Sequence, residues 1–303
     1  MLKIIKFNFI YPNNIHLNIT FAQNKMQLSM KNLLPVILML FAAGANAQYY
    51  YKDIISNKQL LTEMASYREN KIRTVSIKSF EDDGSPSEGF FCQKKISKDY
   101  RKAELFTRSN LSGPSLFTSL FNSNGQVLST HDSSDISVTN NIYSYDENQR
   151  IHSILSSVRS QDDDFVNEIL EEHIYYYDAG GQPEKMIRVK NRTDSTIIMF
   201  AKDDNNNIAI EKDTKNASKY YYYYDAKNRL TDVVHSNDFK TKLLPDYLFE
   251  YNAAGLTSQM TATEEGGNYY FIWKYAYENG LRIREKCYSK EKRLMGTIEY
   301  EYK

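Results

Sequence analysis

Aromatic side chains recur at every second position in short stretches along this chain, and an acidic or amide residue ends each stretch. The clearest copies are Tyr143-Ser-Tyr145-Asp146, Tyr175-Tyr-Tyr177-Asp178, Tyr222-Tyr-Tyr224-Asp225, Phe249-Glu-Tyr251-Asn252 and Tyr275-Ala-Tyr277-Glu278. Weaker copies end at Asn122 and Asp203, and Tyr300-Glu-Tyr302-Lys303 is one more. Side chains two residues apart lie on the same face of a strand. Each copy therefore predicts a strand that stops at its polar residue.

The polar residue is followed by turn chemistry. A residue that tolerates positive φ usually stands three positions later: Gly125, Gly181, Asn206, Asn228 and Gly255. Hairpin loops of three to five residues need such a residue. Successive polar positions are 22 to 32 residues apart, enough for two strands and two turns, and Pro183 suggests an edge or a bulge in its unit. Because one hairpin cannot bury its face alone, the repeats must stack.

The predicted fold class is therefore mostly β, with repetitive antiparallel β-hairpins in a long twisted or curled sheet and a short N-terminal helix. The units resemble YD repeats, the building block of RHS-type proteins, whose consensus is roughly aromatic-x-Tyr-Asp-x-x-Gly-x-Leu. The best match is Tyr222-Tyr-Tyr224-Asp225-Ala-Lys-Asn228-Arg-Leu230, and the resemblance covers residues 117–303. It implies a β shell, which in some family members encloses a toxin, and it implies no particular reaction.

Residues 30–47 have the composition of a secretory signal. Lys31 supplies a positive start, an apolar run follows, and Ala45-Asn-Ala47 is a small-residue cleavage site. We expect cleavage after Ala47, export to the periplasm or the cell exterior, and no stable membrane insertion after signal removal. Residues 1–29 are interpreted as a gene-model extension.

Residues 48–116 precede the repeats. The spacing of Ile55, Leu60 and Met64 predicts a helix over 54–66, with Ser56 as a candidate N-cap. Strand-like alternation is found over 72–77, a loop is predicted over 82–89, and 90–121 is interpreted as degenerate β structure. We expect one continuous domain with a small helical N-terminal cap.

Charge excludes one class of partner. The chain has 38 basic and 38 acidic residues. Nucleic-acid binding needs clustered Lys and Arg, so we expect none.

The sequence gives little support for catalysis, a metal site or a cofactor. Glu171-Glu172-His173 could bind a metal but is typical of a solvated strand end, and Asp162-Asp-Asp164 is typical of a charged hairpin loop. Asp203-Asp-Asn-Asn-Asn207 could hold Ca²⁺, but it stands where the repeat demands a turn. We predict no enzyme activity.

Aromatic residues are the candidate ligand-binding groups. Phe271, Trp273, Tyr275 and Tyr277 share one face of a predicted strand, while Tyr220–Tyr224 must divide between two faces. Such a ladder usually lies in the core, but it could also form a wet platform for sugars or a protein partner. The candidates for that platform are Tyr221, Tyr223, Phe271, Trp273, Tyr275 and Tyr277.

Cys92 and Cys287 are the only cysteines. Each lies near one end of the repeat array, so a disulfide would require the sheet to curl closed. We expect an open, twisted sheet with two free thiols.

The leading hypothesis is an exported, non-catalytic binding or structural component of the cell envelope with a protein or glycan partner. The alternatives are a carbohydrate-binding module and an accessory or remnant of a polymorphic toxin system.

Overall fold

The structure is a computed structural model of the whole chain, and it describes residues 48–303 apart from 111, 163–167, 217, 237–244 and 264–268. Within this part, one helical segment is followed by β-strands that pair antiparallel in one sheet. The helical segment is η2 (Tyr50–Ile55) continued by α1 (Ser56–Glu69). The strands are β1 (Thr74–Phe80), β2 (Phe91–Ile96), β3 (Lys102–Arg108), β4 (Ser115–Phe121), β5 (Val127–Ser134), β6 (Ser137–Tyr145), β7 (Ile151–Ser160), β8 (Glu168–Tyr177), β9 (Pro183–Lys190), β10 (Asp194–Lys202), β11 (Ile208–Asp213), β12 (Lys219–Tyr224), β13 (Leu230–Ser236), β14 (Pro245–Tyr251), β15 (Thr257–Thr263), β16 (Tyr270–Glu278), β17 (Leu281–Tyr288) and β18 (Leu294–Tyr302).

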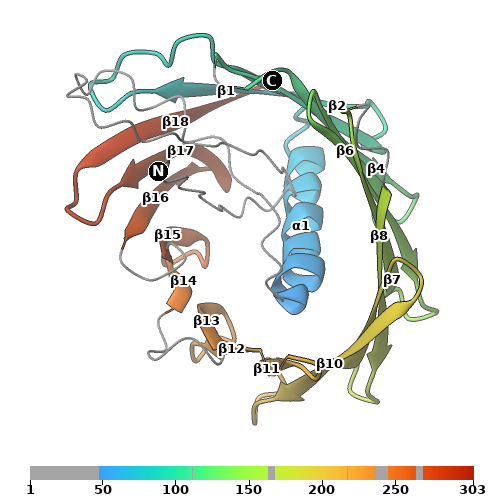
Figure 1. Cartoon of the computed structure of the whole chain (residues 1–303). Coiled ribbons are helices and arrows are strands. Elements are labelled where there is room, and N and C mark those ends of the chain that lie inside the picture. Colours follow the sequence, from blue (N-terminus) through green and yellow to red (C-terminus); the bar gives the residue numbers. More distant parts are fainter. Residues whose placement is uncertain (1–47, 111, 163–167, 217, 237–244, 264–268) are drawn as a thin grey trace, which may run out of the picture.

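The sheet closes into an 18-stranded antiparallel barrel. Each strand pairs with its neighbours in sequence, and β1 pairs with both β2 and β18, so that Ile77 lies opposite Cys92 on one side and Tyr300 on the other. The ring of strands is visible in Figure 1. The expectation of an open sheet was wrong: backbone hydrogen bonds between the first and last strands remove both edges.

The cysteines remain free thiols, as expected, and both are buried. Closure therefore does not depend on a disulfide. Cys92 lies on β2 and Cys287 on β17, where it pairs with Gly296 of β18.

The predicted turns form as the repeat requires. Gly125, Gly181, Asn206, Asn228 and Gly255 all have positive φ. The side-chain oxygen of the polar residue accepts the backbone N–H four positions later, as between Asp225 and Arg229 (3.0 Å) and between Asn252 and Leu256 (3.0 Å). Asp203 likewise accepts the N–H of Asn207 at 2.8 Å, so turn formation explains this segment.

A register shift precedes each of these turns, because the strand after the turn carries one extra residue. Examples lie between Tyr223 and Tyr224 and between Tyr176 and Tyr177, where Tyr177 faces Pro183. The predicted irregularity at Pro183 is thus a bulge, while β9 itself is an inner strand of the sheet. Residues 90–121, interpreted as degenerate, form three regular strands, β2 to β4.

The helical segment lies inside the barrel and crosses its lumen (Figure 1). Its first turn contacts the wall near β8 and β11, and its last turn contacts β18 through the rings of Tyr67 and Tyr302. The helix is longer than predicted at both ends. Ser56 is not its N-cap, since its hydroxyl donates to the Tyr51 carbonyl within the helix at 3.0 Å.

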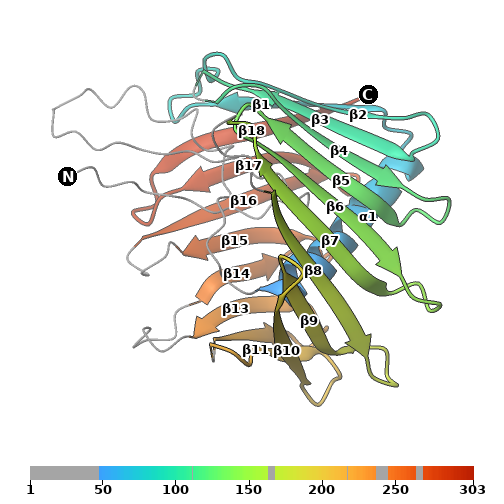
Figure 2. The same ribbon diagram turned by 45° about the vertical axis from the view of Figure 1, so that its right-hand side comes forward.

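The core is the interface between this helix and the inner wall. Leu60, Met64 and Tyr67 of α1 are buried in one hydrophobic cluster with inward-facing residues of strands all around the ring. Tyr51 is also buried, and its ring stacks near those of Tyr247 and Phe249 of β14. The segment expected to cap the fold instead fills its centre, as the turned view in Figure 2 also shows.

Candidate functional site

The six predicted ligand-binding aromatics do not share a surface. Tyr221 and Tyr223 of β12 alternate with the buried Tyr220 and Tyr222 and so face outward, and Tyr223 is 51% exposed. The outward Tyr223 hydroxyl fits the expectation that part of this run reaches solvent.

The other four aromatics, Phe271, Trp273, Tyr275 and Tyr277, face the lumen from β16. Trp273 is 2% exposed, and Phe271 and Tyr275 pack against the core cluster. The guanidinium of Arg282 lies 4.3 Å from the Tyr275 ring centre, and Arg282 in turn donates to Glu285 at 2.8 Å. These rings therefore belong to the interior packing and to a buried ion pair.

The first turn of the helical segment is held by a buried carboxylate. Glu211 of β11 is 0% exposed. Its two oxygens accept the backbone N–H groups of Tyr49 (3.1 Å) and Tyr50 (2.9 Å). The Tyr222 hydroxyl donates to the same carboxylate at 2.9 Å. The first N–H groups of a helix have no partner within it, and a negative group is favourable there, so Glu211 anchors this end.

A second buried cluster lies beside Glu211. His173 of β8 contacts Asp53 of η2 through Nδ1 (2.6 Å) and Glu171 through Nε2 (2.9 Å). The Tyr175 hydroxyl donates to the same Asp53 carboxylate at 2.7 Å. The interpretation of Glu171-Glu172-His173 as a solvated strand end was therefore wrong, since His173 is buried and faces the lumen.

Both clusters have shifted pKa values. Burial raises the pKa of Glu211 to about 7, against the hydrogen bonds from Tyr50, Tyr222 and Tyr49, which lower it. Burial alone would lower the pKa of His173, but the carboxylates of Asp53 and Glu171 outweigh it and raise the pKa to about 9. His173 is therefore a cation between two anions at neutral pH. The arrangement holds the helix electrostatically.

Sequence reasoning missed Glu211 and Asp53. Asp53 lies one residue before the predicted helix. Glu211 lies on β11, whose pairing with β10 contains a bulge between Ala201 and Lys202. The bulge breaks simple alternation, so the inward side of β11 cannot be read from period two alone. The sequence does contain one signal for this site: the acidic Glu211 directly follows the apolar stretch Ile208-Ala-Ile210.

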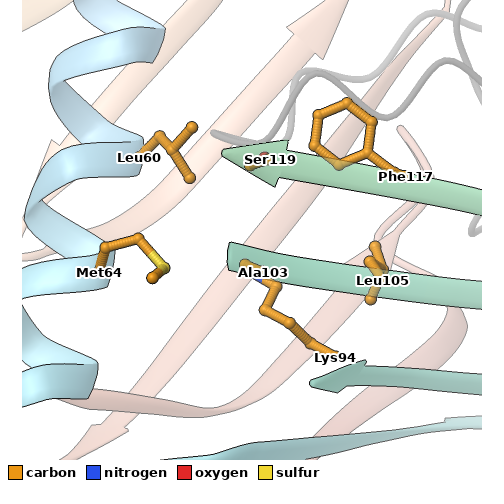
Figure 3. Close-up of a pocket in the computed structure, with 7 residues that line it drawn as sticks. All are labelled: Leu60, Met64, Lys94, Ala103, Leu105, Phe117 and Ser119. Atoms are coloured by element: carbon orange, nitrogen blue, oxygen red, sulfur yellow. The ribbon is translucent and has the colours of Figure 1, made fainter. Parts of the chain in front are cut away.

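The other end of the helix borders a narrow cleft. Leu60 and Met64 of α1 point toward β2–β4, as Figure 3 shows, and the cleft is lined by Leu60, Met64, Lys94, Ala103, Leu105, Phe117 and Ser119. It has room for about one water molecule. The Lys94 ammonium is paired with Glu63 of α1 at 3.0 Å. The cleft is a packing gap between helix and wall.

The outer wall carries a row of three apolar residues and one serine on β4 to β7. Leu120 of β4, Ser129 of β5, Ile142 of β6 and Leu155 of β7 are successive partners across the sheet. These residues, called the outer row below, alternate with buried ones and so face outward, and Ile142 is 56% exposed. The pairing continues to Lys102 of β3 at one end and to Glu172 of β8 at the other.

Charged residues lie at the ends of the outer row and are absent from its middle strands. The outward positions of β4, β5 and β6 carry no Lys, Arg, Asp or Glu. The outward positions of β17 and β18 differ, with Arg284, Lys286 and Glu299 among them. Exposed, contiguous apolar surface on a folded protein marks an interaction site.

In the part of the chain that the structure describes, no group of three or more His, Cys, Asp or Glu side chains is placed to hold a metal ion. In the same residues, no helix has the length and apolarity to cross a membrane.

Among known proteins, the chain matches only solved structures. No family model matches the chain, and no curated protein matches it. The crystal structure of TcdB2-TccC3 is 12% identical with a TM-score of 0.34, and the match covers 77% of this chain but 14% of that one. A porin-like protein from Bacteroides uniformis is 9% identical with a TM-score of 0.35, over 77% of this chain and 98% of that one. A porin-like protein from Bacteroides vulgatus is 11% identical with a TM-score of 0.29 over the same shares. With TM-scores below 0.5, these likenesses do not define a common fold.

Proposed function

We propose that this protein is an exported, non-catalytic binding component of the cell envelope, built from YD-like repeats. Residues 30–47 direct its export, and cleavage after Ala47 leaves residues 48–303 in the periplasm or at the cell exterior. A protein partner docks on the outer wall of the barrel. The observation that supports this role is the outer row on β4–β7.

The chemistry of the surface defines the partner. Protein interfaces have a core that is depleted in charge and a polar rim. The outer row supplies such a core, and Lys102 and Glu172 supply opposite charges at its two ends. The partner accordingly presents an apolar strip with an acidic group opposite Lys102 and a basic group opposite Glu172. A closed barrel offers no free strand edge, so binding uses side chains and not strand addition.

The test is capture of partners from the native envelope with tagged protein, comparing wild type with Ile142→Glu. A buried carboxylate at the interface centre costs several kcal/mol, so we expect loss of about 99% of the captured partner. Thr261→Glu is the matched control, because Thr261 faces outward from β15 between the buried Met260 and Ala262. Equal capture by all three proteins contradicts the proposed surface. Capture of this chain alone assigns the surface to self-association.

A glycan-binding role has one observation in its favour, the exposed Tyr223 ring beside Tyr221 on β12. Aromatic faces stack on sugar rings through apolar contact and C–H groups. Titration with a glycan panel, followed by chemical-shift changes of the Tyr221 and Tyr223 rings, tests it. Unchanged shifts across the panel reject this second role.

A further inference from the structure

The start of the helical segment contacts a cluster of acceptor groups on the barrel wall. Glu211 binds the N–H groups of Tyr49 and Tyr50, and Asp246 lies at the beginning of β14, where its carboxylate accepts the side-chain amide of Gln48 at 3.3 Å. The Tyr220 hydroxyl is also buried here. It lies within electrostatic reach of Glu211 and Asp246 and beside Gln48.

Gln48 lies directly beside this cluster. It is 6% exposed, and its carbonyl accepts the Lys52 N–H at 2.8 Å, which makes it the residue that opens the helix. The N–H groups of a helix all point toward its N-terminal end. The Gln48 nitrogen is separated from that of Tyr49 by one residue, so the two nitrogens lie less than about 4 Å apart. It is therefore close to the two N–H groups already bound to Glu211.

The cluster of acceptor groups favours a cation at this nitrogen. A carboxylate buried in a medium of low dielectric is costly unless a positive group compensates it. Lys52 is within electrostatic reach of Glu211, but its side chain is exposed to solvent. A peptide N–H at Gln48 is neutral and offers one hydrogen, whereas a free amino terminus offers a full charge and three hydrogens.

We propose that the α-ammonium group of Gln48, released when residues 1–47 are removed, binds Glu211 inside the lumen and locks the helical segment in the barrel. The inference rests on the proposed export with cleavage after Ala47. Glu211 is then the residue that binds the processed amino terminus. Processing thereby fixes the helical segment inside the lumen. An unprocessed chain keeps only the neutral N–H contacts of Tyr49 and Tyr50.

The site also affects the chemistry of an amino-terminal glutamine. Such a residue cyclises when its unprotonated α-nitrogen attacks the side-chain carbonyl carbon; the new C–N bond forms, and the amide nitrogen leaves as ammonia. An ammonium bound to Glu211 has no free electron pair, and Asp246 holds the side-chain amide. Cyclisation in the folded protein is therefore slow.

The experiment is a double-mutant cycle on the processed chain, released from a fusion by a protease so that it begins at Gln48. The comparison protein retains Asn46-Ala47 before Gln48. Both the processed and the extended chain are made with Glu211 and with Glu211→Gln. We expect the extension to lower Tm by about 4 °C with Glu211 present and to leave Tm unchanged in Glu211→Gln. An equal change in both backgrounds, or none in either, overturns the proposal.

A second measurement guards against a folding defect in Glu211→Gln. In the wild-type processed chain, conversion of Gln48 to the cyclic form, followed by mass spectrometry, should be at least about tenfold slower in the folded than in the urea-unfolded protein. Equal rates overturn the ammonium site. Amino-terminal sequencing of the natural exported protein tests the export proposal separately, because a start other than Gln48 refutes the processing step whatever the cycle shows.

Discussion

In six of the eight repeats, the residue directly before the polar position is a tyrosine that hydrogen-bonds to the repeat before it. Its hydroxyl donates to the carbonyl of the residue that begins, or nearly begins, the strand after the previous turn. The pairs, all at 2.6–2.9 Å, are Tyr145 with Val127, Tyr177 with Ile151, Tyr224 with Ile208, Tyr251 with Leu230, Tyr277 with Thr257 and Tyr302 with Arg282. This tyrosine ladder explains why the repeat keeps an aromatic residue with a hydroxyl directly before its polar residue.

Removing one hydroxyl from the tyrosine ladder tests its contribution. Tyr224→Phe leaves the Ile208 carbonyl without this donor while keeping the ring, so we expect the free energy of unfolding to fall by about 1 kcal/mol. Tyr223→Phe, on the outer face one residue away, should change it by less than about 0.5 kcal/mol. Urea unfolding measures both. Equal effects would mean that the ladder hydroxyls contribute nothing specific.

Gln149 departs from the turn rule. It has φ of +64° at the position where the other repeats have Gly or Asn. A left-handed conformation costs a non-glycine residue about 1 kcal/mol or more. We expect Gln149→Gly to raise the free energy of unfolding by about 1 kcal/mol, and Gly255→Ala, with φ of +82°, to lower it by a similar amount. Thermal unfolding checks the signs. The same sign for both substitutions would contradict this explanation.

The helical segment is the element whose place could not be derived from sequence. Its apolar spacing predicts a helix with a buried face at Leu60 and Met64, and that is confirmed. Its anchors are separated from it by about 120 residues for His173 and about 160 for Glu211. No local pattern joins groups so far apart. An open sheet has no lumen, so the sequence alone predicts that Glu171-Glu172-His173 is exposed to solvent at the end of a strand.

The charged anchor of this element makes stability depend on pH. The pKa of His173 in the folded protein, about 9, is above the 6.5 of an unfolded chain. Its contribution is complete below pH 6.5 and is lost as pH rises through 9. The pKa of Glu211 is also raised, to about 7, so its contribution is complete below pH 4.5 and is lost as pH rises through 7.

For the chain that keeps the residues before Gln48, in which no α-ammonium group reaches Glu211, we therefore expect the free energy of unfolding to decrease from pH 5 to pH 9.5. His173→Gln should remove most of the decrease between pH 6.5 and 9, and Glu211→Gln most of that between pH 4.5 and 7. Urea unfolding at each pH gives the profile, and exposed His131→Gln is the control. A His131→Gln profile that is as flat as that of His173→Gln would contradict the assignment.

At the scale of the whole molecule, the repeats predicted the strands and turns but not their closure. Period-two aromatics and the Gly or Asn position specify each hairpin locally. The β1–β18 seam depends on β1, which lies outside the repeat pattern, with Val75 opposite Tyr302 and Ser79 opposite Ile298. Curvature accumulates from many small bulges, which the sequence shows one at a time.

The seam can be tested by removing one of its sides. Deleting residues 294–303 removes β18, exposes the edges of β1 and β17 and takes the Tyr300 hydroxyl from Glu285. We expect a protein that aggregates and loses cooperative unfolding, measured by size-exclusion chromatography and calorimetry. Glu301→Ala, which removes only the exposed ion pair with Lys78, should change stability by no more than about 1 kcal/mol. A monomeric, cooperative truncated chain would show that β18 is dispensable.

Joining the first strand to the last also determines the order of events during biosynthesis. Hairpins form within microseconds from adjacent segments, but the seam unites residues more than 200 positions apart. A polypeptide still emerging from a ribosome or a translocation pore can only build an unfinished, curved ribbon with its aromatic face exposed. The ring forms after the final segment has emerged, so the interval before closure is when this protein most needs a chaperone.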